Sequence, residues 1–154
     1  MATSMSTPLP ASVKRPIARV LVVEDDRQTG DLMKLALSRL LMDATLSTSG
    51  EEALARLTTE TYDLILLDIV LPGMSGFDLC RQLQVFPQLQ GIPVIFVSGL
   101  ATPANKEEAQ RLGAVDFIEK PVPLLQFLAR VMGQLQLKTN SERESRPLWP
   151  VATP

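Results

Sequence analysis

The chain is predicted to form an α/β fold, in which helices cover both faces of one parallel sheet. One observation behind this prediction is a set of short apolar runs, such as 64–67, whose continuous apolar character is typical of strands buried on both faces. A second observation is that segments with helical spacing of apolar residues separate these runs. Such alternation favours parallel strands joined by right-handed crossovers.

Each predicted strand corresponds to one of these apolar runs. The first is rich in valine and leucine, whereas the second alternates only weakly and is predicted as a short edge strand. The central strand ends in an acid, Asp68, and the fourth tolerates Pro93 because the proline stands at its start. The predicted strands span 18–23, 43–48, 64–68, 92–98 and 115–119.

A helix is predicted after each strand. The first spans 31–42, where apolar residues recur at helical spacing. The second opens with Ser49 and Glu52, which fit a capping box. The remaining helices begin near Ser75, Thr102 and Pro123.

Composition at the two ends of the chain predicts the domain limits. The first residues are rich in Ser, Thr and Pro, and the last ones are polar and end in prolines. We therefore expect a flexible N-terminal arm at 1–16, one folded domain at 17–137 and a polar C-terminal tail at 138–154.

The overall composition excludes several classes of function. The formal net charge of −2 provides no basic surface for nucleic acid, and no apolar stretch approaches the length of a membrane span. Histidine, the commonest general base and metal ligand, is absent. The single cysteine, Cys80, cannot form an internal disulfide and favours a reducing compartment, so we expect a cytoplasmic protein.

Chemically active residues follow four of the predicted strands. Glu24 and Asp25 follow the first, Asp68 ends the third, Ser98 ends the fourth and Lys120 follows the fifth. Parallel strands bring their carboxyl ends to one edge, so these carboxylates would repel one another unless a cation lay between them. Ligands with oxygen atoms alone favour Mg²⁺, or Mn²⁺, over zinc. An aspartate at such a site can attack phosphorus.

This order of motifs resembles the receiver domain of bacterial two-component response regulators. The resemblance covers about residues 18–137 and rests on an acidic pair, an aspartate, a Ser and a Lys-Pro pair, each at the end of its strand. It implies a flavodoxin-like (βα)5 fold, doubly wound, with strand order 2-1-3-4-5.

The resemblance also implies a role for each carboxylate. Asp68 matches the phospho-acceptor, and Glu24 and Asp25 match the acidic pair that binds Mg²⁺ together with Asp68 and the backbone carbonyl of Val70. Asp26 is an additional acid, which we expect to cap the following helix. Val70 offers an attacking water no side-chain hydrogen bond, so a short-lived phosphoryl group is not expected.

Ser98, Lys120 and Phe117 match the residues that respond to phosphorylation in this family. Ser98 would hydrogen-bond a phosphoryl oxygen, and Lys120 would pair with the acceptor and then with the phosphoryl group. Phe117 stands at the position of the switch aromatic, without the hydroxyl of a tyrosine, and the bond to Pro121 is expected to be cis.

The resemblance therefore predicts a signalling domain and not an enzyme. A sensor histidine kinase or a phosphotransfer protein would donate a phosphoryl group to Asp68 in a Mg²⁺-dependent reaction. The chain would be a stand-alone or excised receiver that switches the binding of a protein partner or its own dimerisation, without direct contact to nucleic acid or membrane. The expected face comprises the fourth helix, fifth strand and fifth helix, with Lys106, Glu107, Arg111, Asp116, Glu119 and Arg130 on it.

Three other functions are compatible with parts of this sequence. A phosphatase with an aspartyl nucleophile would need a second acid two residues later, where Val70 stands. A dinucleotide-binding protein would need a glycine-rich turn after the first strand, where the acids stand. A degenerate receiver that binds proteins without phosphorylation remains as the alternative, although Asp68, Ser98 and Lys120 are all present.

Overall fold

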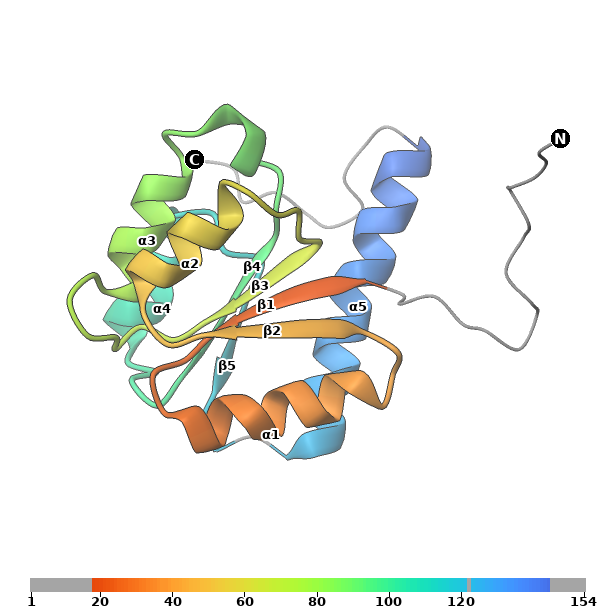
Figure 1. Cartoon of the computed structure of the whole chain (residues 1–154), viewed down its shortest axis with the longest axis horizontal. Helices are drawn as coiled ribbons and strands as arrows, with labels where there is room; N and C mark the ends of the chain where they lie inside the picture. Colours follow the sequence, from red (N-terminus) through yellow and green to blue (C-terminus); the bar gives the residue numbers. More distant parts are fainter. Residues whose placement is uncertain (1–17, 122, 145–154) are drawn as a thin grey trace, which may run out of the picture.

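The fold is a five-stranded parallel sheet with helices on both faces (Figure 1). The computed structural model describes residues 18–121 and 123–144. The strand order is β2-β1-β3-β4-β5, so the predicted fold class and strand order are both confirmed. The predicted N-terminal arm, 1–16, and residues 145–154 of the predicted tail lie outside the described residues.

The elements alternate along the chain as the sequence predicts. The strands are β1 (Arg19–Val23), β2 (Asp43–Ser47), β3 (Leu64–Leu67), β4 (Val94–Ser98) and β5 (Asp116–Glu119). The helices are α1 (Arg27–Ser38), α2 (Gly50–Leu57), α3 (Gly76–Leu83), α4 (Pro103–Arg111) and α5 (Leu124–Glu144), with a short 3-10 helix at Pro87–Leu89.

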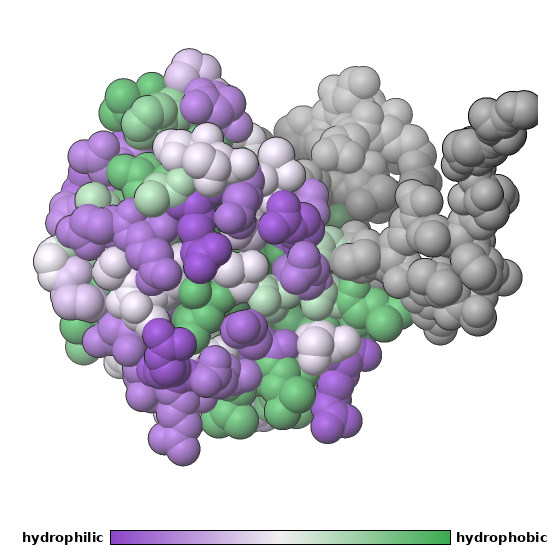
Figure 2. Space-filling model, in the orientation of Figure 1, coloured by the Kyte–Doolittle hydropathy of each residue, from purple (hydrophilic) through white to green (hydrophobic). Residues whose placement is uncertain are grey.

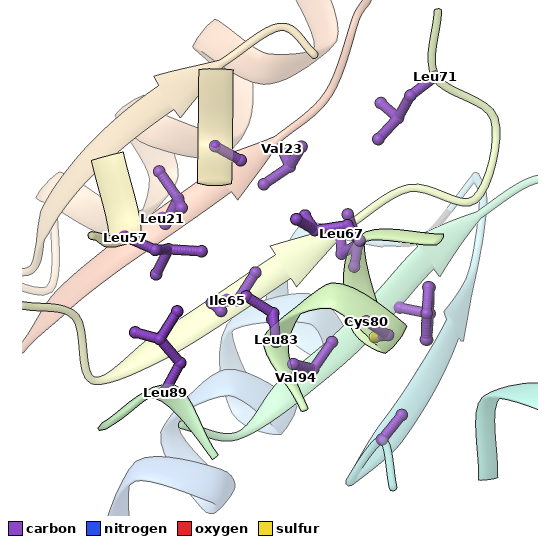
Figure 3. Packing of buried hydrophobic residues seen from close by; sticks show 14 of the residues in the cluster. Leu21, Val23, Leu57, Ile65, Leu67, Leu71, Cys80, Leu83, Leu89 and Val94 are labelled. Carbon is purple, nitrogen blue, oxygen red and sulfur yellow. The ribbon is translucent and has the colours of Figure 1, made fainter. Parts of the chain in front are cut away.

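The sheet separates two hydrophobic cores. Successive residues of a strand point to opposite faces, so Leu21 and Val23 of β1 pack toward α2, α3 and α4, whereas Val20 and Val22 pack toward α1 and α5. Figure 3 shows the first core, where Ile65 of β3 lies among side chains of the neighbouring strands and helices. This burial on both faces explains why the central strands lack polar alternation.

Two positions between β3 and the first turn of α3 require glycine. A side chain at Gly76, the first residue of α3, would place its Cβ 2.1 Å from the carbonyl oxygen of Asp68. At Gly73 the backbone is left-handed, with φ of 70°. These two glycines allow the chain to turn tightly after β3 and bring α3 back against the sheet.

Helix caps differ in part from the predicted ones. Ser49 accepts a hydrogen bond from the Glu52 amide, but Glu52 accepts from Thr48 and does not complete the predicted capping box. A full capping box is formed instead by Ser75 and Asp78 at α3. Thr102 caps α4 as predicted.

The limits of two helices, α1 and α5, were predicted incorrectly. Helix α1 begins at Arg27, four residues before the predicted start, and ends at Ser38 instead of residue 42. Asp26 does take the N-cap position, but its carboxylate accepts from the Thr29 hydroxyl and not from a cap amide. Helix α5 continues through Glu144, beyond the predicted start of the tail at residue 138. The domain limits themselves stay a prediction.

The face of the molecule that Figure 2 shows is largely hydrophilic. On the face in Figure 2, hydrophilic residues surround separate, small groups of apolar residues. Within residues 18–121 and 123–144, no helix combines the length and the hydropathy that crossing a bilayer requires.

Candidate functional site

The predicted site residues meet at the carboxyl end of the sheet because β1 and β3 are adjacent. Val23 of β1 pairs with Leu67 of β3, and the Asp68 amide donates to the Val23 carbonyl at 3.1 Å. The residues that follow these two strands, Glu24 and Asp68, therefore leave the sheet side by side.

Glu24, Asp25 and Asp68 form a cluster of three carboxylates. One oxygen from each lies within 4.8 Å of the others. Asp25 is exposed, whereas Glu24 and Asp68 are only 3% and 7% exposed. Burying charged carboxylates is costly unless they are paired, so the two inner acids require a counter-charge.

Lys120 provides that counter-charge. Its ammonium donates to the Asp68 carboxylate at 2.9 Å and also contacts the Glu24 carboxylate. The Lys120–Pro121 peptide bond that follows is cis. The resemblance predicts the contact of Lys120 with Asp68 but not its contact with Glu24.

The burial of this cluster alters the pKa of two groups. Burial raises the pKa of Glu24, although the hydrogen bond from Lys120 works in the opposite direction. Burial by itself would lower the pKa of Lys120, but the hydrogen bonds and charges of Glu24 and Asp68 together raise it above its ordinary value. Lys120 is therefore held firmly in its charged form at neutral pH.

The three acids fit the requirements of a hard divalent cation. Their donor atoms are all carboxylate oxygens, which Mg²⁺ prefers. Three carboxylates and one ammonium leave two formal negative charges, which a divalent cation would neutralise. The donor set offers no nitrogen or sulfur ligand that would favour zinc.

Ser98 lies at the end of β4, next to the strand that precedes Lys120. It is 1% exposed, and its hydroxyl accepts a hydrogen bond from the Leu100 amide at 3.2 Å. The Lys120 amide in turn donates to the Ser98 carbonyl at 3.0 Å. The main chains of these two predicted site residues are thus directly joined.

Phe117 is half-buried on the α2–α3–α4 side of the sheet. Its ring stacks on Phe96 at 6.1 Å between centroids, and Phe96 meets Phe77 edge to face at 5.2 Å. Phe117 is therefore part of a row of aromatic rings that reaches the first core. No described contact joins its ring to the carboxylates.

The loop after β3 brings Val70 to the site. The Val70 amide lies 3.4 Å from an Asp68 carboxylate oxygen, which is a weak hydrogen bond. The flanking Ile69 and Leu71 are buried in the first core, whereas the Val70 side chain is half-exposed. The loop backbone is therefore held close to Asp68 while the Val70 side chain faces solvent.

The charged residues predicted for the α4–β5–α5 face are mostly paired within this chain. Arg130 of α5 binds both carboxylate oxygens of Asp116 on β5 and donates to the Phe117 carbonyl at 3.2 Å. Arg111 of α4 pairs with Glu107 and Glu108 of the same helix. The Arg130 contacts join α5 to β5, and the Arg111 pairs lie within α4.

The chain is similar to several response regulators of known sequence. It shares 34% identity over 125 residues with the sensory transduction protein RegX3 of Mycobacterium tuberculosis, covering 81% of this chain and 54% of RegX3. It shares 33% identity over 121 residues with the response regulator PleD of Caulobacter vibrioides, covering 79% of this chain and 27% of PleD. The chain thus corresponds to about half of RegX3 and to a smaller part of PleD.

Solved structures show the same fold. A CheY-like response regulator receiver domain protein from Methanospirillum hungatei superposes with a TM-score of 0.75 at 28% identity, covering 83% of this chain and 99% of that one. The BeF3-activated N-terminal receiver domain of Klebsiella pneumoniae RstA superposes with a TM-score of 0.71 at 35% identity, covering 77% and 98%. The family model for the response regulator receiver domain matches residues 20–132, so the chain belongs to the response regulator receiver domain family.

Proposed function

We propose that this receiver domain accepts a phosphoryl group on Asp68 from a phosphohistidine of a sensor kinase or phosphotransfer protein. The observation that carries the proposal is the arrangement of Asp68, in contact with Lys120 and within 4.8 Å of Glu24 and Asp25. A nucleophilic carboxylate beside a fixed ammonium and two further acids matches the needs of phosphoryl transfer.

In the proposed reaction, a carboxylate oxygen of Asp68 attacks phosphorus. The new oxygen–phosphorus bond forms while the phosphorus–nitrogen bond of the donor breaks, and its electron pair returns to the donor imidazole. Lys120 stays beside Asp68 and pairs with the negative charge of the transferred group. Ser98 turns its hydroxyl from the Leu100 amide toward a phosphoryl oxygen.

The metal ligands in this proposal are Glu24, Asp25, Asp68 and the Val70 backbone carbonyl. Members of the receiver family bind Mg²⁺ through acidic residues, and the oxygen-only cluster fits that ion. When bound, Mg²⁺, or Mn²⁺, would neutralise phosphoryl charge that Lys120 alone cannot balance.

The proposed output is a change in protein binding. Receivers are signalling domains, and phosphorylation of Asp68 would bias Ser98 and Phe117 between two arrangements. The α4–β5–α5 face would then bind a downstream protein or a second copy of the chain. We assign residues 17–137 to the receiver, acting alone or within a longer protein, and its lone cysteine supports a reducing, cytoplasmic setting.

Acetyl phosphate tests the phosphoryl-accepting role directly. The protein is incubated with acetyl phosphate, with and without Mg²⁺, and its intact mass is measured. Asp68→Asn is measured in parallel, and the control is Asp43→Asn, because Asp43 is the first residue of β2 and lies at the amino end of the sheet. We expect a Mg²⁺-dependent gain of one phosphoryl group in the wild type and in Asp43→Asn, and none in Asp68→Asn. An unmodified wild type would favour the alternative, a receiver that binds proteins without phosphorylation.

A further inference from the structure

The loop between β3 and α3 is held at two places. At its base, the Gly76 amide donates to the Ile69 carbonyl at 2.9 Å. Near its far end, the Met74 amide donates to the carboxylate of Glu51 at 3.2 Å, across 23 residues of sequence. The second anchor comes from the first turn of α2, a helix that contributes no residue to the carboxylate cluster.

The contact between Glu51 and the loop is close-fitting. A Cβ at Gly73 would lie 2.9 Å from the same Glu51 carboxylate oxygen, so the absence of a side chain there leaves room for it. Beside it, Gly50 faces the side chain of Met74, where a Cβ would lie 3.2 Å away. The first turn of α2 therefore packs directly on residues 73–74 of the loop.

The neighbouring acid, Glu52, has a different partner. Its carboxylate accepts from the Thr48 amide at 2.8 Å, within the segment that enters α2. Glu51 and Glu52 are both exposed, and both lie in the first turn of α2, where a negative charge interacts favourably with the helix dipole. Glu52 also forms an ion pair with Arg56 of the same helix at 3.7 Å. Glu51 reaches the loop, whereas the described contacts of Glu52 stay within α2 and the segment that enters it.

We propose that Glu51 is a positioning residue that holds the β3–α3 loop in the shape needed for cation binding beside Asp68. This inference rests on the proposed function, because the same loop carries Val70, whose carbonyl is a proposed ligand. Ile69 and Leu71 fix the loop to the core, and Glu51 restrains the residues that follow them. Without Glu51, the loop would lose its only described hydrogen bond to α2.

The test compares Glu51→Ala, Glu51→Gln and the matched control Glu52→Ala in the full chain. Mg²⁺ is titrated into each ¹⁵N-labelled protein, and the dissociation constant is taken from the amide shifts of Asp25 and Asp68. We expect Mg²⁺ to bind roughly three- to tenfold more weakly to Glu51→Ala, the range that loss of one hydrogen bond supports. Glu51→Gln retains an acceptor oxygen and should bind within about twofold of the wild type.

Two further readouts separate positioning from a general loss of stability. Amide exchange at Met74 should accelerate in Glu51→Ala alone, whereas exchange at Thr48 should accelerate in Glu52→Ala alone. With acetyl phosphate, Glu51→Ala should need more Mg²⁺ for half-maximal rate but reach the wild-type rate at saturation. Urea denaturation should show no greater loss of stability in Glu51→Ala than in Glu52→Ala, which also loses the ion pair with Arg56.

The outcomes distinguish this inference from the proposed function. If the wild type binds Mg²⁺ and is phosphorylated but Glu51→Ala and Glu52→Ala bind Mg²⁺ equally well, the role of Glu51 is refuted and the function stands. If the wild type binds Mg²⁺ with the expected weakening in Glu51→Ala but accepts no phosphoryl group, the positioning role stands and the proposed function fails. A wild type that binds no Mg²⁺ overturns both.

Discussion

The two ends of the parallel sheet carry charged clusters of similar composition but different physical character. At the carboxyl end, Lys120 contacts Glu24 and Asp68, and both acids are almost fully buried. At the amino end, Arg19 of β1 lies 3.5 Å from Asp43 and 3.7 Å from Glu60, and all three side chains are between 35% and 50% exposed. Burial, and not the number of charges, separates them.

The amino-end cluster acts as a brace. The Arg19 side chain donates to the Thr61 carbonyl at 3.0 Å and lies over the Tyr62 ring at 4.9 Å, while its amide donates to Asp63 at 2.8 Å. These contacts join β1 to the segment that leads into β3. Exposed ion pairs of this kind contribute little each, about 0.2–1 kcal/mol, because water and salt screen them.

The charges of the carboxyl-end cluster interact more strongly, because burial of Glu24 and Asp68 keeps water and salt from screening them in the same way. Electrostatic interactions are stronger where water is excluded, so each charge there strongly affects the others. Acids lie at strand ends elsewhere in the chain, but burial beside Lys120 makes Glu24 and Asp68 a candidate site.

Replacing the basic residue of each cluster, Lys120 or Arg19, should give the largest difference between the two ends of the sheet. We expect Lys120→Met to lower the rate of phosphorylation by acetyl phosphate about 100-fold, because the variant loses a group that stabilises negative charge in the transition state. Arg19→Met should leave that rate unchanged and lower the free energy of unfolding by about 1–2 kcal/mol, the sum of several weak contacts. Intact-mass kinetics and urea denaturation measure the two effects. Equal rates in Lys120→Met and the wild type would contradict the proposed role of Lys120.

Binding of Mg²⁺ should raise the Tm, and this smaller effect should depend on acids at the carboxyl end of the sheet and not on those at the amino end. At ten times its dissociation constant, Mg²⁺ should stabilise the wild type by about 1.4 kcal/mol, which corresponds to a rise in Tm of roughly 5 °C. Asp25→Asn removes a proposed ligand and should lose most of this rise, whereas Asp43→Asn at the amino end should keep it. Differential scanning calorimetry with Mg²⁺ and with EDTA tests this, and a full rise in Asp25→Asn would count against the site.

The smallest effect concerns Tyr62, a buried titrating group at the amino end. Burial raises the pKa of its hydroxyl above the ordinary value of 10.0, and the hydrogen bond that it donates to Glu60 acts in the same direction. The folded state thus holds this proton more tightly than the unfolded state. The resulting stability is fully present below pH 10 and is lost as pH rises through the folded pKa.

Tyr62 is the only tyrosine, so absorbance of tyrosinate reports its titration alone. We expect a midpoint above 10 in the folded protein and near 10 in urea, with Glu60→Gln shifting the folded midpoint downward. A folded midpoint at or below the urea value would show that the Tyr62 hydroxyl is not held as the structure indicates.

Local sequence determined the sheet and the residues at its carboxyl edge. The strands were predictable because burial on both faces demands continuous apolar runs, as in 64–67, and this requirement leaves a direct record in the sequence. The positions of Asp68, Ser98 and Lys120 followed because each stands at the end of such a run. The same reasoning failed at α1, where Arg27, Gln28 and Thr29 form the first turn without apolar periodicity.

Tertiary structure decided the contacts between residues distant in sequence. Lys120 and Glu24 are 96 positions apart, and only the order of the strands brings the ammonium to both buried acids. The sequence places Glu51 in the first turn of α2, but no local pattern indicates that its carboxylate accepts a hydrogen bond from the Met74 amide. Hydrophobic periodicity records which side of an element is buried, but charge pairing depends on which elements become neighbours, and that is fixed only when the whole sheet assembles.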